Sequence, residues 1–171
     1  TSLGGVLEVD SSLGGGTTFR IELPAAVAAT AAPPAPATVA PGAAGRILVI
    51  DDEPAVLAAI GRILGKEHDV VMLADSREAL RQIEAGEHFD VVFCDLMMPH
   101  LSGDALYARV ATVAPAIAAR FVFITGGACE TRLQRFLSEA PNPCIDKPFS
   151  VDTLRMAAQR QLERHAAPAS A

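Results

Sequence analysis

The chain has 171 residues and a formal net charge of −6. Because no basic stripe or arginine cluster accompanies this acidic balance, a nucleic-acid partner is not expected. The length leaves room for one ordinary domain with a buried core, plus additional segments. Cys94, Cys129 and Cys144 are odd in number and widely spaced, which favours reduced thiols in a cytoplasm over a disulfide framework.

The first 45 residues differ from the rest in composition and in the pattern of apolar residues. Residues 1–24 contain two strand-like runs, Val6–Val9 and Thr18–Leu23, joined by a turn rich in serine and glycine. Residues 25–45 are mainly alanine and proline, without a charged residue. A membrane span could have this length, but the prolines would break its helix repeatedly. We interpret residues 25–45 as an extended linker without membrane contact, and we expect no secretion signal.

Strand-like and helix-like segments alternate between residues 46 and 165. The strand-like runs are residues 46–50, 68–73, 90–94, 120–125 and 143–146. Apolar residues at helical spacing then predict helices at residues 53–65, 76–85, 102–113, 130–140 and 150–161. Five βα units with short loops predict an α/β fold, a doubly wound parallel sheet with helices on both faces. Residues 166–171 are expected to form a tail.

Polar residues stand where four of the five expected strands end. They are Asp51 and Asp52 after the first strand, Asp95 at the third, Thr125 at the fourth and Lys147 after the fifth. Ligands of an open parallel sheet gather outside the carboxyl ends of its strands, so we expect these residues to share one rim. Clustered carboxylates repel one another unless a cation joins them, and oxygen ligands suit Mg²⁺. A carboxylate oriented by a metal beside a lysine and a hydroxyl has the parts of a phosphoryl acceptor.

Four separated motifs, "DDE", "DLMMPHLSG", "FITGG" and "DKPF", carry a family resemblance. In their order and spacing, residues 46–165 closely resemble the receiver domain of two-component signalling proteins. The resemblance implies a flavodoxin-like fold with strand order 2-1-3-4-5 and a cis bond between Lys147 and Pro148. It also implies that Asp95 is the phosphorylated aspartate, that Thr125 engages the phosphoryl group and that Lys147 pairs with it.

The same resemblance implies a magnesium site. Asp51 and Asp52 would be the metal-binding acids, joined by Asp95 and by the main-chain carbonyl of Met97. Mg²⁺ would then be the cofactor of phosphoryl transfer.

Two departures from the family pattern concern the conformational response to phosphorylation and the lifetime of the phosphoryl group. Cys144 stands three positions before Lys147, where signalling receivers usually carry an aromatic switch residue. The resemblance therefore does not extend to the usual coupling between threonine movement and aromatic rotation, and it does not imply a large conformational change on phosphorylation. Met97 and Gly127 flank the phosphorylation site where many receivers carry polar groups. Neither side chain can readily orient a hydrolytic water, so we do not expect a short phosphoryl lifetime.

The stretch "GGVLEVDSSLGGGTTFRIELP" resembles the last strands of a histidine-kinase ATP-binding domain, with "GGGTTF" as its final glycine box. The elements that hold Mg²⁺-ATP are absent from this stretch, and no phosphoacceptor-histidine box is found in the chain. The resemblance implies the C-terminal part of a bacterial hybrid sensor histidine kinase, which supports only aspartyl phosphorylation and dephosphorylation. Its partner would be a histidine kinase dimerisation and phosphotransfer domain, or a histidine phosphotransferase.

Two alternatives stay open at this stage. A docking module could keep the fold without being phosphorylated. A phosphohydrolase that forms an aspartyl-phosphate is less favoured, because it would normally place a second acid two residues after the nucleophile, where this chain has Met97. Cys94 adjoins Asp95, but strand alternation points its side chain away, so we interpret it as a core residue.

Overall fold

The computed structural model describes residues 6–12, 14, 16–22, 44–126 and 131–166. The chain divides into two units between residues 39 and 40, and each unit is described by itself. In the part of the chain so described, no helix is long and apolar enough to cross a membrane.

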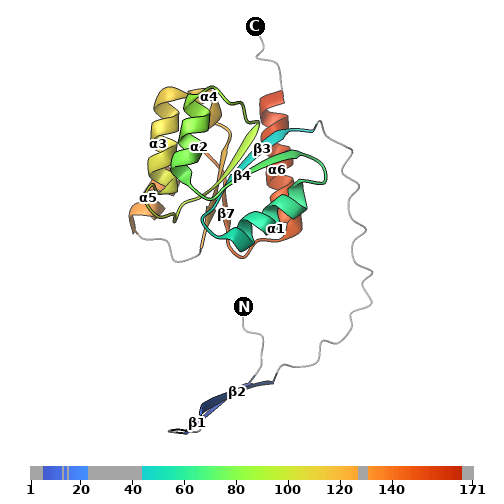
Figure 1. The fold of residues 1–171 in the computed structure, drawn as a ribbon, viewed down its shortest axis with the longest axis vertical. Coiled ribbons are helices and arrows are strands. Elements are labelled where there is room, and N and C mark those ends of the chain that lie inside the picture. Colours follow the sequence, from blue (N-terminus) through green and yellow to red (C-terminus); the bar gives the residue numbers. More distant parts are fainter. Residues whose placement is uncertain (1–5, 13, 15, 23–43, 127–130, 167–171) are drawn as a thin grey trace. The chain divides into compact units, whose positions relative to one another are not determined.

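The first unit contains an antiparallel hairpin of β1 (Val6–Ser12) and β2 (Gly16–Glu22) (Figure 1). Residues directly opposite each other in such a pair lie on the same face. Val9 is opposite Phe19, and both side chains are exposed, at 55% and 64%. An isolated two-stranded hairpin is marginally stable in water, and this pair leaves two large apolar side chains exposed on one of its faces.

The second unit contains a sheet and six helices within the described residues. Its strands are β3 (Arg46–Ile50), β4 (Asp69–Leu73), β5 (Val91–Asp95), β6 (Phe121–Thr125) and β7 (Cys144–Asp146). Its helices are α1 (Pro54–Leu64), α2 (Ser76–Glu84), α3 (Gly103–Val113), α4 (Pro115–Ala118), α5 (Thr131–Glu139) and α6 (Val151–Ala166). All pairings are parallel in the order β4-β3-β5-β6-β7. Counted within this sheet, the order is 2-1-3-4-5, so the predicted fold class and strand order are confirmed.

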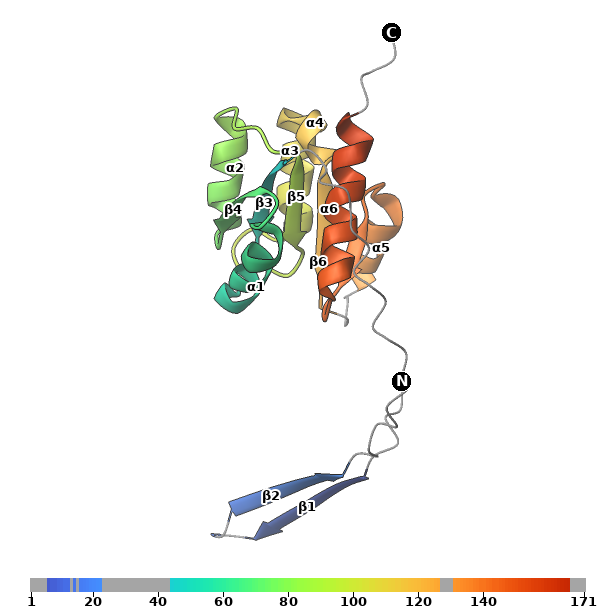
Figure 2. The same cartoon turned by 90° about the vertical axis from the view of Figure 1, so that its right-hand side faces the viewer.

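The helices cover the sheet on both sides. Helices α2, α3 and α5 lie on one side and α1 and α6 on the other (Figure 1), and Figure 2 looks onto the side of α1 and α6. Every residue of β5 and β6 is buried, as expected for central strands of a parallel sheet covered on both faces. The short helix α4 was not predicted, because four residues are too few to show a helical period.

Helix ends differ slightly from those predicted. The helix predicted at residues 53–65 begins at Pro54 and ends at Leu64, and its N-cap Glu53 makes no side-chain capping bond. The last helix continues to Ala166, beyond the predicted end at residue 161. Ser150 caps this helix at its start, because its hydroxyl accepts a hydrogen bond of 3.1 Å from the main-chain N–H of Thr153.

Charged side chains meet at the amino ends of the strands, opposite to the rim predicted for the site. The Asp90 carboxylate accepts a 2.9 Å hydrogen bond from the main-chain N–H of Arg46 and lies 3.1 Å from His88 Nε2. Arg120 Nη1 lies 3.5 Å from the same carboxylate. Burial opposes the charge of Asp90, but these contacts outweigh it and hold its pKa below the ordinary value. The network therefore stabilises the folded state at neutral pH.

Candidate functional site

Asp51 and Asp95 are brought together by neighbouring strands. The register pairs Ile50 of β3 with Cys94 of β5, so the acids that follow these residues stand side by side at the carboxyl ends. Asp51 is fully buried and Asp95 is 3% exposed. Two buried carboxylates at one place are costly unless positive charge or hydrogen bonds compensate them. The other groups of the rim provide this compensation.

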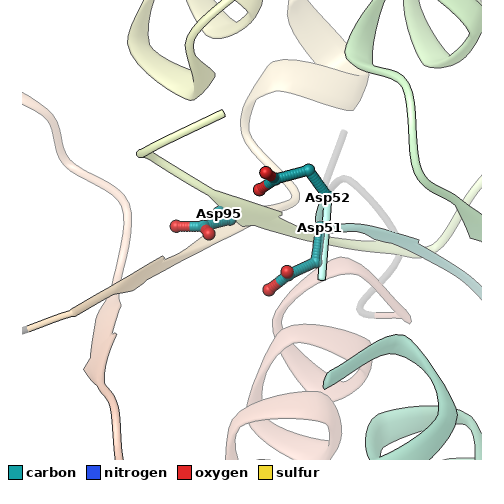
Figure 3. Close-up of side chains that lie close together, drawn as sticks. All are labelled: Asp51, Asp52 and Asp95. Atoms are coloured by element: carbon teal, nitrogen blue, oxygen red, sulfur yellow. The ribbon is translucent and has the colours of Figure 1, made fainter. Parts of the chain in front are cut away.

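Asp52 completes a group of three acids. One carboxylate oxygen from each of Asp51, Asp52 and Asp95 lies within 4.8 Å of the other two. In Figure 3, the carboxyl groups of Asp51 and Asp52 turn toward the side on which Asp95 lies. Oxygen ligands this close together fit a small hard divalent cation such as Mg²⁺, which binds carboxylates, carbonyls and water. The donor set therefore fits the cofactor predicted from the sequence.

Lys147 lies between the two buried acids. Its Nζ donates hydrogen bonds of 2.9 Å to Asp51 Oδ2 and 3.0 Å to Asp95 Oδ2. Glu53 Oε1 is a third neighbour at 3.6 Å. The lysine follows β7, and its main-chain N–H donates a 2.6 Å hydrogen bond to the carbonyl of Thr125. The bond between Lys147 and Pro148 is cis, as the family resemblance implied.

The charges of Asp51, Asp95 and Lys147 affect one another's protonation. Burial raises the pKa of Asp51 and the charge of Asp95 adds to this effect, while the hydrogen bonds from Lys147 and the Glu53 amide oppose it. Burial opposes the charge of Lys147, but its bonds to the two acids outweigh burial and raise the pKa of the ammonium group. The lysine is therefore charged at every physiological pH and offsets one of the carboxylates.

The loop after Asp95 is held tightly at both ends. The main-chain N–H of Met97 donates to Asp95 Oδ1 at 3.1 Å, and that of Leu96 donates to the Ile124 carbonyl at 3.0 Å. At the far end, the N–H of Gly103 donates to the Leu96 carbonyl at 3.1 Å. A Cβ on Gly103 would lie 2.9 Å from Leu96 Cα and closer still to the Asp95 main-chain oxygen. Only a residue without a side chain fits there.

Thr125 and Cys144, also predicted from the sequence, belong to the last two strands of the sheet. Thr125 ends β6 at the same rim and is 4% exposed. Cys144 begins β7 and is exposed, opposite Phe123 in the strand register. Phe123 packs edge-on against Phe136 of α5 and Tyr107 of α3, with ring centroids 5.0 Å and 5.3 Å apart. Aromatic packing on this face of the sheet therefore comes from β6, α3 and α5.

Other predicted residues fall into three groups. Cys94 is fully buried, and burial raises the pKa of its thiol, which agrees with a core role. The side chain of Met97 is 53% exposed, and its main chain lies next to Asp95. Gly127 and Cys129 lie outside the described residues. Sequence reasoning missed Gly103 as a packing requirement, and only its place just before an expected helix could have indicated it.

A family comparison agrees with this geometry. Residues 47–159 match the family model described as the response regulator receiver domain. Among solved structures, a receiver domain protein from Clostridium thermocellum is 28% identical, with a TM-score of 0.63 over 71% of this chain and 96% of that one. A CheY-like receiver domain protein from Methanospirillum hungatei is 25% identical, with a TM-score of 0.65 over 72% of this chain and 97% of that one.

The similar curated proteins include sensor kinases. Sensor kinase CckA of Brucella abortus is 29% identical over an alignment that covers 94% of this chain and 18% of that protein. Virulence sensor protein BvgS of Bordetella bronchiseptica is 32% identical over an alignment that covers 97% of this chain and 14% of that protein. The chain thus spans less than a fifth of the length of either relative, and both matches extend beyond residues 47–159.

Proposed function

The chain belongs to the response regulator receiver family, and we propose that Asp95 accepts a phosphoryl group from a phosphohistidine. The observation that carries this proposal is the position of Lys147 Nζ, 2.9 Å from Asp51 and 3.0 Å from Asp95. Together with Asp52, this arrangement provides a nucleophile, a group of metal ligands and a fixed positive charge at one rim.

Asp95 is oriented for attack by its hydrogen bonds. Its two carboxylate oxygens are held by the Met97 amide and by Lys147. In the transfer, an Asp95 oxygen forms a bond to phosphorus while the bond between phosphorus and the donor imidazole nitrogen breaks. That nitrogen keeps the electron pair. Lys147 and the Thr125 hydroxyl bind oxygens of the transferred group, where its negative charge is concentrated.

The proposed cofactor is Mg²⁺, held by Asp51, Asp52, Asp95 and the main-chain carbonyl of Met97. Lys147 supplies one positive charge against three carboxylates, so the site retains negative charge that a divalent cation neutralises. When bound, the ion supplies electrostatic stabilisation of phosphoryl oxygens.

We further propose that residues 1–24 are the end of a kinase ATP-binding domain. The domain organisation is then residues 1–24 from that domain, a linker at 25–45, the receiver at 46–165 and a tail at 166–171. The exposed pair Val9 and Phe19 supports this, because the other elements of such a domain would cover it. Similarity to two sensor kinases over 94% and 97% of the chain gives further support. The phosphoryl donor or recipient is then a histidine kinase phosphotransfer domain or a histidine phosphotransferase in the cytoplasm.

Labelling tests the assignment of Asp95. Incubation of the chain with a phosphorylated histidine phosphotransferase and Mg²⁺ should transfer the label to Asp95. Asp95→Ala should remain unlabelled, while Asp69→Ala, an exposed acid at the other end of the sheet, should label normally. Equal labelling of the Asp95→Ala variant would contradict the proposal.

Beryllofluoride, a phosphoryl mimic, distinguishes the receiver from a docking module that is not phosphorylated. Binding that requires Mg²⁺ and Asp95 supports the receiver assignment. A protein that binds neither Mg²⁺ nor beryllofluoride would be such a docking module.

A further inference from the structure

Ser76 is a polar residue in a place where the core is otherwise apolar. It is the first residue of α2 and is only 1% exposed. Its hydroxyl donates a hydrogen bond of 2.6 Å to the main-chain carbonyl of Leu101. Leu101 belongs to the loop between Asp95 and α3, so this bond connects a separate helix to the segment that follows the proposed phosphoacceptor.

The middle of this loop has a different kind of support from its ends. The ends are held by hydrogen bonds to Asp95, Ile124 and Leu96. In the middle, the main-chain N–H of Leu101 donates a 2.8 Å hydrogen bond to the Pro99 carbonyl within the loop itself, and the side chains of Met98 and Leu101 are buried in the core. Apolar burial is not directional, so it holds these side chains without setting the direction of the main-chain carbonyls. The hydroxyl of Ser76 sets the direction of one of them.

Helix α2 is fixed in position at the end from which Ser76 contacts Leu101. Its N-cap Asp75 accepts a 2.9 Å hydrogen bond from the main-chain N–H of Arg77, which fixes the first turn. Ala79, Leu80 and Ile83 are buried in the same core cluster as the loop side chains. A hydroxyl on the first residue of this helix therefore has a defined position, as a positioning group requires.

We propose that Ser76 is a positioning residue for the magnesium site. By holding the Leu101 carbonyl, it keeps the loop at residues 96–102 in the conformation that presents the Met97 carbonyl to the metal. This inference rests on the proposed function, because it assumes that Met97 supplies a ligand. Groups that orient metal ligands commonly contribute to affinity although they do not touch the ion.

The test compares Mg²⁺ affinity in the full chain and in its Ser76→Ala variant by isothermal titration calorimetry. Removing the hydroxyl should raise the Mg²⁺ dissociation constant about tenfold, the lower end of the effect of losing a supporting contact. Amide hydrogen exchange at Met97 and Leu101, measured by NMR without Mg²⁺, should become faster. Ser76→Cys has nearly the same shape and a weak donor, so its dissociation constant should fall between the two.

Two control variants separate positioning from general effects. Ser138→Ala removes a similar bond, a serine hydroxyl donating at 2.7 Å to the Arg135 carbonyl, on the exposed side of α5. It should leave Mg²⁺ affinity unchanged. Ile83→Val trims the buried face of α2 and leaves the Ser76 hydroxyl in place. It should lower the unfolding temperature while Mg²⁺ affinity stays within about twofold of wild type, a change far below the tenfold effect expected of a supporting contact.

The outcomes distinguish this inference from the function on which it rests. Wild-type affinity in both Ser76 variants would overturn the role of Ser76 and leave the proposed function intact. The role would also be overturned if Ile83→Val weakened Mg²⁺ binding as much as Ser76→Ala at an equal loss of unfolding temperature. A wild-type chain that does not bind Mg²⁺ would instead overturn the proposed function.

Discussion

Replacing Gly103 with alanine tests how closely α3 packs against the strand that carries Asp95. The added methyl carbon would lie 2.9 Å from Leu96 Cα and 3.0 Å from the Asp95 carbonyl carbon, with the Asp95 oxygen closer still. These are backbone atoms, which cannot rotate away as a side chain can. Either the start of α3 or the end of β5 therefore has to move.

The size of the effect follows from these distances. Non-bonded carbon atoms prefer separations of about 3.5–4.0 Å, so relief of this contact needs a displacement of about 0.6–1 Å. Overpacking of this kind costs about 1–3 kcal/mol. The displacement also strains the hydrogen bond from the Gly103 amide to the Leu96 carbonyl. We expect Gly103→Ala to lower the free energy of unfolding by about 2–3 kcal/mol.

Urea unfolding in EDTA measures this loss, and Gly61→Ala is its control. A Cβ on Gly61 would meet the thioether end of Met72, which is 47% exposed and free to move. Gly61 lies inside α1, where alanine is favoured over glycine by about 1 kcal/mol. The control should therefore be neutral or stabilised.

The displacement should also weaken Mg²⁺ binding, because it moves the backbone at Asp95. A Gly103→Ala variant with the urea midpoint and Mg²⁺ affinity of wild type would refute the packing argument.

Three further predictions concern charge and aromatic packing. Asp51→Asn should stabilise the metal-free protein at pH 7. Burial raises the pKa of Asp51 in the folded state, so the stability that the protonated carboxyl contributes is lost as the pH rises through the folded-state pKa. Asparagine carries no charge at this buried position and does not lose that stability. The urea-midpoint difference should vanish in acid and shrink or reverse when Mg²⁺ is added. Asp90→Asn should destabilise by about 1 kcal/mol at pH 7, after allowance for solvent screening. Since the folded pKa of Asp90 is lowered, this difference should disappear as the pH falls through that value, as urea unfolding across pH would show. Phe136→Leu should cost about 1–2 kcal/mol in urea unfolding, because it removes edge-on contacts with Tyr107 and Phe123.

Much of the fold could be predicted from local patterns. A short β-branched run such as Arg46–Ile50 can be recognised by itself, because a strand buried on both faces has no polar alternation. The ends of these runs then identified Asp51, Asp95 and Thr125 as rim residues. Helix α4 and the far end of α6 escaped prediction, because a single turn shows no period and helix ends depend on tertiary contacts.

The sequence by itself determined the alternation of strands and helices and placed acids at strand ends, since these depend on burial along a local segment. The tertiary structure decided which acids meet. The adjacency of β3 and β5 puts Asp51 beside Asp95, and Lys147 reaches Asp51 from 96 positions away. Close approaches at Gly103 and Ser76 depend on how α3 and α2 pack, and local periodicity carries no information about such distant contacts.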